Sequence, residues 1–131
     1  MSHIAVTMRC EQAAAVGETR DALDERWPAF LAEVGVTPVL VPNHGGALHR
    51  ILDSTPLKGV LLTGGGDLAR YGGKFPQRDA VESKLLAVAI ERKLPVLGVC
   101  RGMQVLQTHF GVALRKYPGH VAPHQNILIN G

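Results

Sequence analysis

Cys100 is the side chain best placed for nucleophilic chemistry. It lies in the segment Gly98-Val99-Cys100-Arg101-Gly102, directly after the apolar run 95–99 and before a helical pattern. A nucleophile elbow requires this order of strand, sharp turn and helix, with small residues two positions before and after the nucleophile. A helix N-terminus also favours the thiolate, which is the reactive species, over the thiol. The segment therefore predicts a reactive cysteine; the alternative is a buried cysteine whose glycines only permit close packing.

Acyl transfer also requires N–H donors for the oxyanion that develops on the substrate carbonyl. One predicted donor is the backbone N–H of Arg101, the residue after the nucleophile. Gly64, Gly65 and Gly66 end another predicted strand, and glycine lets a backbone N–H approach a ligand closely. This run lacks the Lys-Ser/Thr pair of a P-loop and the spacing of a dinucleotide-binding loop. We therefore expect the second donor from Gly65 or Gly66; the alternative is an ordinary tight turn.

A parallel sheet is needed to bring these residues together, because the carboxyl ends of parallel strands meet at one edge. Short apolar runs alternate with helical patterns, which predicts an α/β fold with a doubly wound, mostly parallel sheet of the flavodoxin-like type. We expect strands at 3–8, 36–41, 58–63, 95–99, 112–114 and 126–129. We expect helices at 23–34, 47–52, 78–92 and 101–110, with Thr19 as a cap of the first.

The composition argues against several other classes of protein. With 131 residues, 46% of them apolar, the chain is expected to form one globular domain. Its net charge of +3 comes without a basic run, so we expect no nucleic-acid partner. No apolar stretch reaches the roughly 18 residues of a membrane span, and the first residues lack a signal-peptide pattern. Two cysteines do not form a disulfide framework, so we expect a cytoplasmic protein.

Three segments resemble one known family. They are 61–68 (Leu-Leu-Thr-Gly-Gly-Gly-Asp-Leu), Arg78-Asp79 with Glu82, and 95–104 (Pro-Val-Leu-Gly-Val-Cys-Arg-Gly-Met-Gln). They are similar to the γ-glutamyl hydrolase branch of the class I glutamine amidotransferase superfamily, and the resemblance covers nearly the whole chain. It implies that Cys100 attacks the side-chain carbonyl of a γ-glutamyl amide, that a thioester forms as an amine leaves, and that water then frees glutamate. It implies neither a metal nor a cofactor.

Within this branch, further residues look most like the enzymes that release a nucleotide amidate from γ-glutamyl-CDP-amidate in capsule biosynthesis. They are Arg20-Asp21-Ala22-Leu23-Asp24, Trp27, Pro42-Asn43 and His120-Val121. Such a leaving group carries phosphates, so we expect positive charge at the carboxyl ends of the strands. Arg9, Arg101 and Lys74 are the candidates, and the two arginines are preferred because a guanidinium binds phosphate through two parallel hydrogen bonds. The alternative for Arg101 is that it only braces the loop.

The resemblance suggests roles for residues on two of the predicted helices. Gln104 matches the family position that contacts the glutamyl group; the alternative is a glutamine on the helix surface. Arg78, Asp79 and Glu82 match an Arg-Asp-x-x-Glu pattern at a helix start. Because Arg78 and Glu82 are four residues apart, a pair on the helix surface explains them at least as well as substrate contact.

The family's general base is a histidine oriented by a glutamate, and no His-x-Glu pair follows Cys100. His109 falls about three turns along the predicted helix, and His120 and His124 match a stretch that precedes the family's base. The chain ends on Asn130-Gly131, a turn signal with no returning strand. We therefore expect residues 1–131 to be the N-terminal part of a single glutamine amidotransferase-like domain that is truncated at its C-terminus; the alternative is a frayed tail.

Two other functions remain open from the sequence. One is a glutaminase subunit that delivers ammonia to a synthase, and the other is a catalytically incomplete fragment that acts only in binding. Both catalytic hypotheses predict a small-molecule γ-glutamyl substrate. The sequence leaves open whether the protein partner is a synthase or a second copy in a homodimer. Activity on free glutamine without a synthase separates the two catalytic hypotheses.

Overall fold

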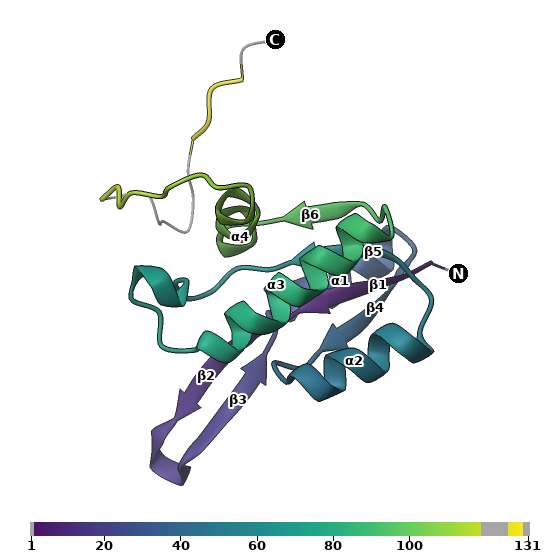
Figure 1. The fold of residues 1–131 in the computed structure, drawn as a ribbon, viewed down its shortest axis with the longest axis horizontal. Helices are drawn as coiled ribbons and strands as arrows, with labels where there is room; N and C mark the ends of the chain where they lie inside the picture. The colour runs from purple at the N-terminus through teal and green to yellow at the C-terminus, as the bar shows by residue number, and fades with distance from the viewer. Residues whose placement is uncertain (1, 119–125, 130–131) are drawn as a thin grey trace.

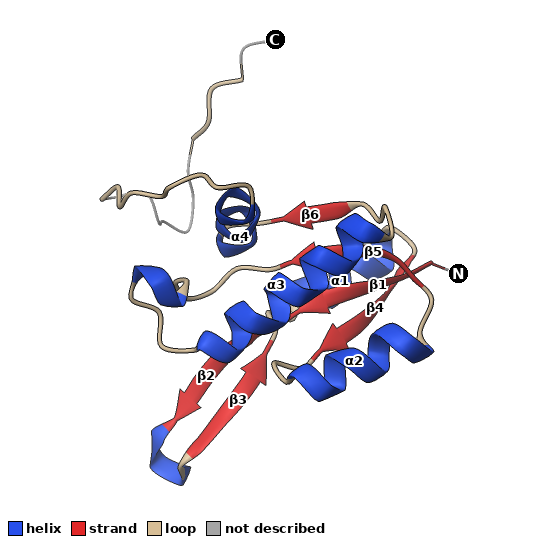
Figure 2. Cartoon of the chain, in the orientation of Figure 1, coloured by secondary structure: helices blue, strands red, loops and turns tan. Residues whose placement is uncertain are grey.

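The computed structural model describes residues 2–118 and 126–129, and a parallel four-stranded sheet forms its central layer (Figures 1 and 2). The strand order is β4-β1-β5-β6, and every neighbouring pair is parallel. These strands are β1 (Ser2–Thr7), β4 (Val36–Val41), β5 (Leu57–Leu62) and β6 (Val96–Gly98). The helices are α1 (Arg26–Glu33), α2 (Gly45–Ser54), α3 (Pro76–Glu91) and α4 (Arg101–His109). The predicted α/β class is confirmed.

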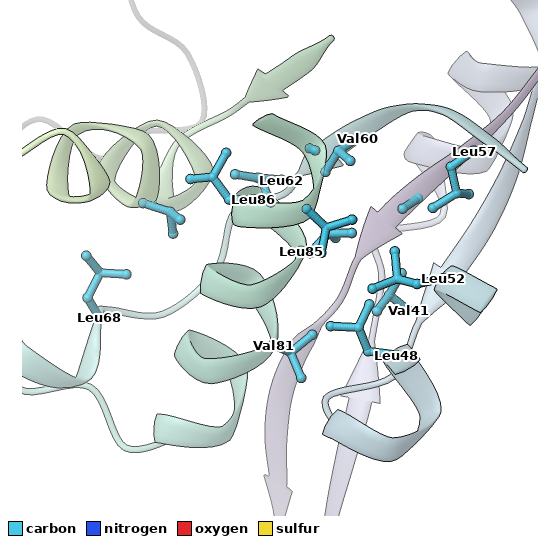
Figure 3. Close-up of a cluster of buried hydrophobic side chains, with 14 residues drawn as sticks. Val41, Leu48, Leu52, Leu57, Val60, Leu62, Leu68, Val81, Leu85 and Leu86 are labelled. Carbon is cyan, nitrogen blue, oxygen red and sulfur yellow. The ribbon is translucent and has the colours of Figure 1, made fainter. Parts of the chain in front are cut away.

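Helices cover both faces of the sheet because successive strand residues point to opposite sides. Val60 and Leu62 of β5 belong to one apolar cluster with residues of α2, α3 and α4, whereas Leu61 between them packs with Leu31 of α1. In Figure 1, α2 and α3 accordingly lie in front of the sheet and α1 behind it. Figure 3 shows the larger cluster, in which Leu85 of α3 is fully buried. The strands are therefore apolar on both faces, as the unbroken apolar runs predicted.

An antiparallel hairpin of β2 (Arg9–Ala13) and β3 (Glu18–Ala22) projects from the sheet beyond the end of β1 (Figure 1). The sequence analysis did not predict this hairpin, whose residues are mostly polar and exposed. It turns through a short 3₁₀ helix (Ala14–Val16) that ends at Gly17 with a φ of 68°. The predicted helix cap at Thr19 is wrong, because Thr19 belongs to β3 and hydrogen-bonds Gln12 across the hairpin.

The start of α1 is set instead by Asp24, whose carboxylate accepts a hydrogen bond from the backbone N–H of Arg26. Pro28 is the third residue of this helix. A proline is tolerated there because the first N–H groups of a helix have no intrahelical acceptor. The helix therefore begins a few residues later than its apolar pattern predicted.

The two short strands predicted after α4 are wrong. Residues 112–114 and 126–129 form no strand, and Ile127 and Leu128 are exposed. Apolar residues with β propensity need a neighbouring strand to complete their hydrogen bonds. Within the described part of the chain, β6 pairs with β5 and neither segment joins the sheet. In the same described residues, no helix is both long and apolar enough to cross a membrane.

Candidate active site

Cys100 occupies the turn between β6 and α4, and its side chain is exposed. Its φ is 52° and its ψ is −111°, a backbone conformation that residues other than glycine rarely adopt. The positive φ expected from the flanking glycines is therefore confirmed. Cys100 is also the residue that precedes the first turn of α4, so its thiol sits at the positive end of the helix dipole.

The two glycines around Cys100 are required by close contacts of the backbone. A Cβ on Gly98 would lie 2.5 Å from the carbonyl oxygen of Gly102, and a Cβ on Gly102 would overlap the carbonyl oxygen of Leu62 at the end of β5. The same carbonyl of Leu62 accepts a hydrogen bond of 3.0 Å from the N–H of Val99. The turn is therefore pressed against the end of β5, which places Cys100 beside the residues that follow this strand.

Those residues are the predicted glycine run, and the structure brings it to Cys100. A Cβ on Gly64 would lie 3.2 Å from the Cβ of Cys100. Gly65 and Gly66 follow with φ values of 96° and 77°, which glycine adopts without strain. A Cβ on Gly65 would lie 2.6 Å from Cδ of Arg9, so the aliphatic stem of that arginine packs against the turn. Three separate segments of the sequence thus meet at this end of the sheet.

Arg78 and Glu82 of α3 form a buried ion pair beneath this turn. Their Nε–Oε1 distance is 2.7 Å, and their side chains are 2% and 0% exposed. The pair on the helix surface that their spacing suggested is therefore wrong: the four-residue spacing is present, but it faces the sheet. Burial lowers the pKa of Arg78 and the neighbouring Glu82 carboxylate opposes this shift, so the carboxylate helps to keep the guanidinium charged.

Arg101 joins the same network from α4. Its guanidinium donates to the second oxygen of Glu82 and to Asp79, and its side chain is 2% exposed. The expectation that this side chain faces a phosphate at the mouth of the site is therefore wrong, and bracing of the loop is what the structure shows. The backbone N–H of Arg101 is the first of α4 and has no acceptor within the helix. Its role as an oxyanion donor stays a prediction.

Arg9 and Lys74 line separate cavities on the two sides of the glycine turn. Arg9 borders a cavity of about 200 Å³ together with Trp27, Gly64 and Gly65. Its side chain is half exposed and forms an ion pair with Glu11. Lys74 borders the other cavity, of about 220 Å³. Of the three cationic candidates, Arg9 alone combines exposure with packing against the turn beside Cys100.

Cys10 also borders the second cavity, but it is buried as predicted. Its thiol lies 3.8 Å from an oxygen of Asp21 and is the donor. Burial, and then the neighbouring carboxylate, raise the pKa of Cys10 above its ordinary value, so its reactive thiolate is disfavoured. The two cysteines therefore differ in both access and environment.

The described residues settle the positions of Gln104 and His109 only in part. Gln104 is half-buried one turn into α4, and its N–H donates to the carbonyl of Cys100 at 3.3 Å. Contact of its side chain with a glutamyl group stays a prediction. His109 is the last residue of α4, roughly 13 Å along the helix from Cys100 at 1.5 Å per residue. His120 and His124 lie outside the described residues. Among those that are described, no group of three metal-ligating side chains occurs.

A family model described as Peptidase C26 matches residues 3–123. The chain belongs to the Peptidase C26 family. The class I glutamine amidotransferase-like resemblance of the sequence is thereby confirmed. The gamma-glutamyl-CDP-amidate hydrolase of Campylobacter jejuni is 32% identical over 71 residues, which cover 53% of this chain and 36% of that protein.

Two further relatives are named as the glutamine-hydrolyzing component of a GMP synthase. The protein from Methanococcus aeolicus is 27% identical over 90 residues, which cover 69% of this chain and 42% of that protein. The protein from Methanocaldococcus jannaschii is 30% identical over 81 residues, which cover 62% of this chain and 37% of that protein. The chain therefore spans less than half the length of each of these three relatives. All three names concern a transformation of a γ-glutamyl group or of glutamine.

The buried network of this Peptidase C26 protein was the main feature of the site that sequence reasoning missed. A signal was nevertheless present in α3. Arg78 and Glu82 precede Leu85 and Ala89 at helical spacing, and all four side chains are buried on one face. Charged residues in line with an apolar stripe indicate a buried pair, because a solvated pair occupies the opposite face.

We predict that Gly102→Ala destabilises the fold and displaces Cys100. The added methyl group overlaps the carbonyl oxygen of Leu62, so α4 must move away from β5. Overpacking of this kind costs about 1–3 kcal/mol in the free energy of unfolding, which urea denaturation measures. Gly45→Ala is the matched control, because a Cβ at Gly45 meets nothing within 4 Å. Equal stabilities of the two variants would show that the close contact between α4 and β5 is not required.

Proposed function

We propose that this protein hydrolyses a γ-glutamyl amide through a thioester on Cys100. The observation that carries the proposal is the position of an exposed thiol at positive φ, at a helix N-terminus and beside Gly64, in a chain of the Peptidase C26 family. The Cys100 thiolate attacks the carbonyl carbon, and a C–S bond forms as the carbonyl oxygen becomes an oxyanion. The C–N bond then breaks and the amine leaves with a proton. Water cleaves the thioester, which yields glutamate and restores the thiol.

The oxyanion is stabilised in this proposal by the N–H of Arg101 and by an N–H of Gly65 or Gly66. Support comes from the placement of both groups next to Cys100: Arg101 follows it in the chain, and the glycine run contacts it across the end of β5. Each such donor contributes about 10²–10³ in rate in enzymes where one has been removed. Gln104, one turn into α4, is proposed to contact the glutamyl group.

The proton for the leaving amine needs a general acid, and His109 at the far end of α4 is too distant to supply it. We propose that this group, a histidine with its glutamate partner, lies outside these 131 residues. A missing acid affects amides much more than activated esters, because a nitrophenolate leaves without a proton whereas an amine does not. The two kinds of substrate therefore separate the role of Cys100 from the role of the base.

We predict that the chain releases about one equivalent of nitrophenolate from γ-glutamyl 4-nitrophenyl ester in a burst, while a γ-glutamyl anilide is turned over at a rate lower by the roughly 10²–10⁴ of a general acid. Stopped-flow absorbance measures both. Cys100→Ser should abolish the burst, and Cys10→Ser, the matched control at the buried thiol, should preserve it. Rapid anilide turnover that His120→Gln or His124→Gln removes would place the base within the chain and contradict this part of the proposal.

For the leaving group, we propose a phosphate-bearing amine that is bound by Arg9. The Campylobacter jejuni relative has a nucleotide amidate in its name. In this chain, Arg9 is the candidate cation that is both exposed and packed against the glycine turn. Trp27 borders the same cavity and offers an aromatic surface beside it. A charged hydrogen bond to phosphate is worth about 1.5–3 kcal/mol.

We predict that the chain binds cytidine diphosphate and that Arg9→Ala weakens this binding about tenfold to a hundredfold, in line with the loss of such a bond. Isothermal titration calorimetry at fixed ionic strength measures the dissociation constants. Arg50→Ala, which removes an exposed positive charge from α2, is the control and should leave binding unchanged. An equal effect of the two substitutions would mean that Arg9 contributes only general positive charge.

A glutaminase that serves a synthase is the second candidate function, and the two relatives named for GMP synthase favour it. A protein of this kind acts on free glutamine and passes ammonia to its synthase partner. Glutamine-dependent acylation of Cys100 that appears only when a synthase is added would support this function. Acylation by the nucleotide-bearing substrate without any partner would support the hydrolase.

A further inference from the structure

The guanidinium of Arg78 binds three consecutive backbone carbonyls at the end of β5. It donates from Nη2 to the carbonyl oxygens of Thr63 (2.9 Å) and Gly64 (3.1 Å), and from Nη1 to that of Gly65 (2.6 Å). Its remaining donor, Nε, binds Glu82 at 2.7 Å. One side chain thus fixes the direction of three peptide groups in the turn that lies beside Cys100.

Fixing a carbonyl also fixes the N–H group that follows it. A trans peptide is planar, and its C=O and N–H point in opposite directions; the described residues include no cis peptide. Because the carbonyls of Gly64 and Gly65 point at Arg78, the N–H groups of Gly65 and Gly66 point away from it. These two N–H groups are the predicted oxyanion donors.

Glu82 connects this turn to the other predicted donor. One of its oxygens accepts from Arg78 and the other from Arg101, whose own backbone N–H begins α4. Asp79 binds Arg101 as well, and its second oxygen accepts from the N–H of Ala69 at 2.7 Å. Two guanidinium groups therefore face two carboxylates, so the buried charges are balanced and each is held in one position.

We infer that Arg78 is a positioning residue for acyl transfer: it holds the N–H groups of Gly65 and Gly66 in the orientation that stabilises the oxyanion formed at Cys100. This inference rests on the proposed function. Lysine keeps the charge but is a single point donor, so it cannot bind the three carbonyls and Glu82 together. Arg78→Lys is therefore expected to lower the rate of reactions that form an oxyanion and to spare reactions of Cys100 that form none.

Two reactions of the same thiol make this distinction. Acylation by γ-glutamyl 4-nitrophenyl ester passes through an oxyanion, whereas alkylation by iodoacetamide is a displacement at carbon and does not. In the 131-residue chain, we expect Arg78→Lys to slow the acylation burst by about 10², the lower end of the range for a lost donor, and to change the alkylation rate less than about twofold. Arg92→Lys is the matched control, because Arg92 also donates to a backbone carbonyl, that of Leu52, from the opposite end of α3. It should leave both rates unchanged.

Unchanged acylation in Arg78→Lys overturns the inference, and so does a parallel fall of both rates, which indicates a general loss of structure around Cys100. If Arg78→Lys does not fold, as judged by circular dichroism, Glu82→Gln keeps the size of the side chain and weakens the hold on Arg78, and the same pattern of rates is expected from it. A wild-type chain with no Cys100-dependent burst refutes the proposed function and this inference with it. A normal wild-type burst with unchanged rates in the variant refutes the positioning role alone.

Discussion

The carboxylate of Glu82 lies between two guanidinium groups in the interior of the protein, and the arrangement of the site depends on it. Arg78 reaches from this carboxylate to the turn after β5, and Arg101 reaches from it to the start of α4. Buried ion pairs contribute little net stability, because the loss of hydration offsets the attraction between the charges. Removing one partner is nevertheless costly, about 3–5 kcal/mol, because it leaves a charge without a counter-ion. The network is therefore best understood as a device for geometry.

The parallel sheet makes this device possible. β5 and β6 end side by side, with Leu62 paired to Gly98, so the glycine turn and the Cys100 turn leave the sheet at adjacent points. Gly98 and Gly102 then allow α4 to approach β5 closely enough for Arg101 to reach Glu82 on α3. A larger residue at either glycine would separate the parts that the ion network joins. Backbone packing and buried charge are thus two parts of one arrangement.

Much of this arrangement could be predicted from local sequence patterns. The elbow-like turn at Cys100 follows from glycines at fixed distances around a cysteine between a strand and a helix, and these are short-range constraints. The four strands of the sheet were predicted nearly to the residue, because their apolar runs are bounded by turns. The hairpin of β2 and β3 was missed because its residues are polar, and its pairing depends on a turn rather than on burial.

Other features depend on contacts that no local pattern contains. The spacing of Arg78 and Glu82 predicted a pair, but only the apolar residues on the same face of α3 show that the pair is buried. Arg101 was expected at the mouth of the site because its backbone lies there, yet its side chain turns inward to carboxylates 19 and 22 residues earlier. The segment 126–129 has a strand-like sequence, but a strand forms only where a neighbour accepts its hydrogen bonds.

The central claim is that Cys100 carries the acyl group, and mass spectrometry of the acylated chain tests it most directly. The chain is mixed with γ-glutamyl 4-nitrophenyl ester, quenched in acid to preserve a thioester, digested and mapped. The account predicts one glutamyl group on the peptide that contains Cys100, labile to hydroxylamine as a thioester is, and no modification of Cys10. A glutamyl group on any other residue, or an unmodified Cys100 under conditions where the ester is consumed, would contradict the account.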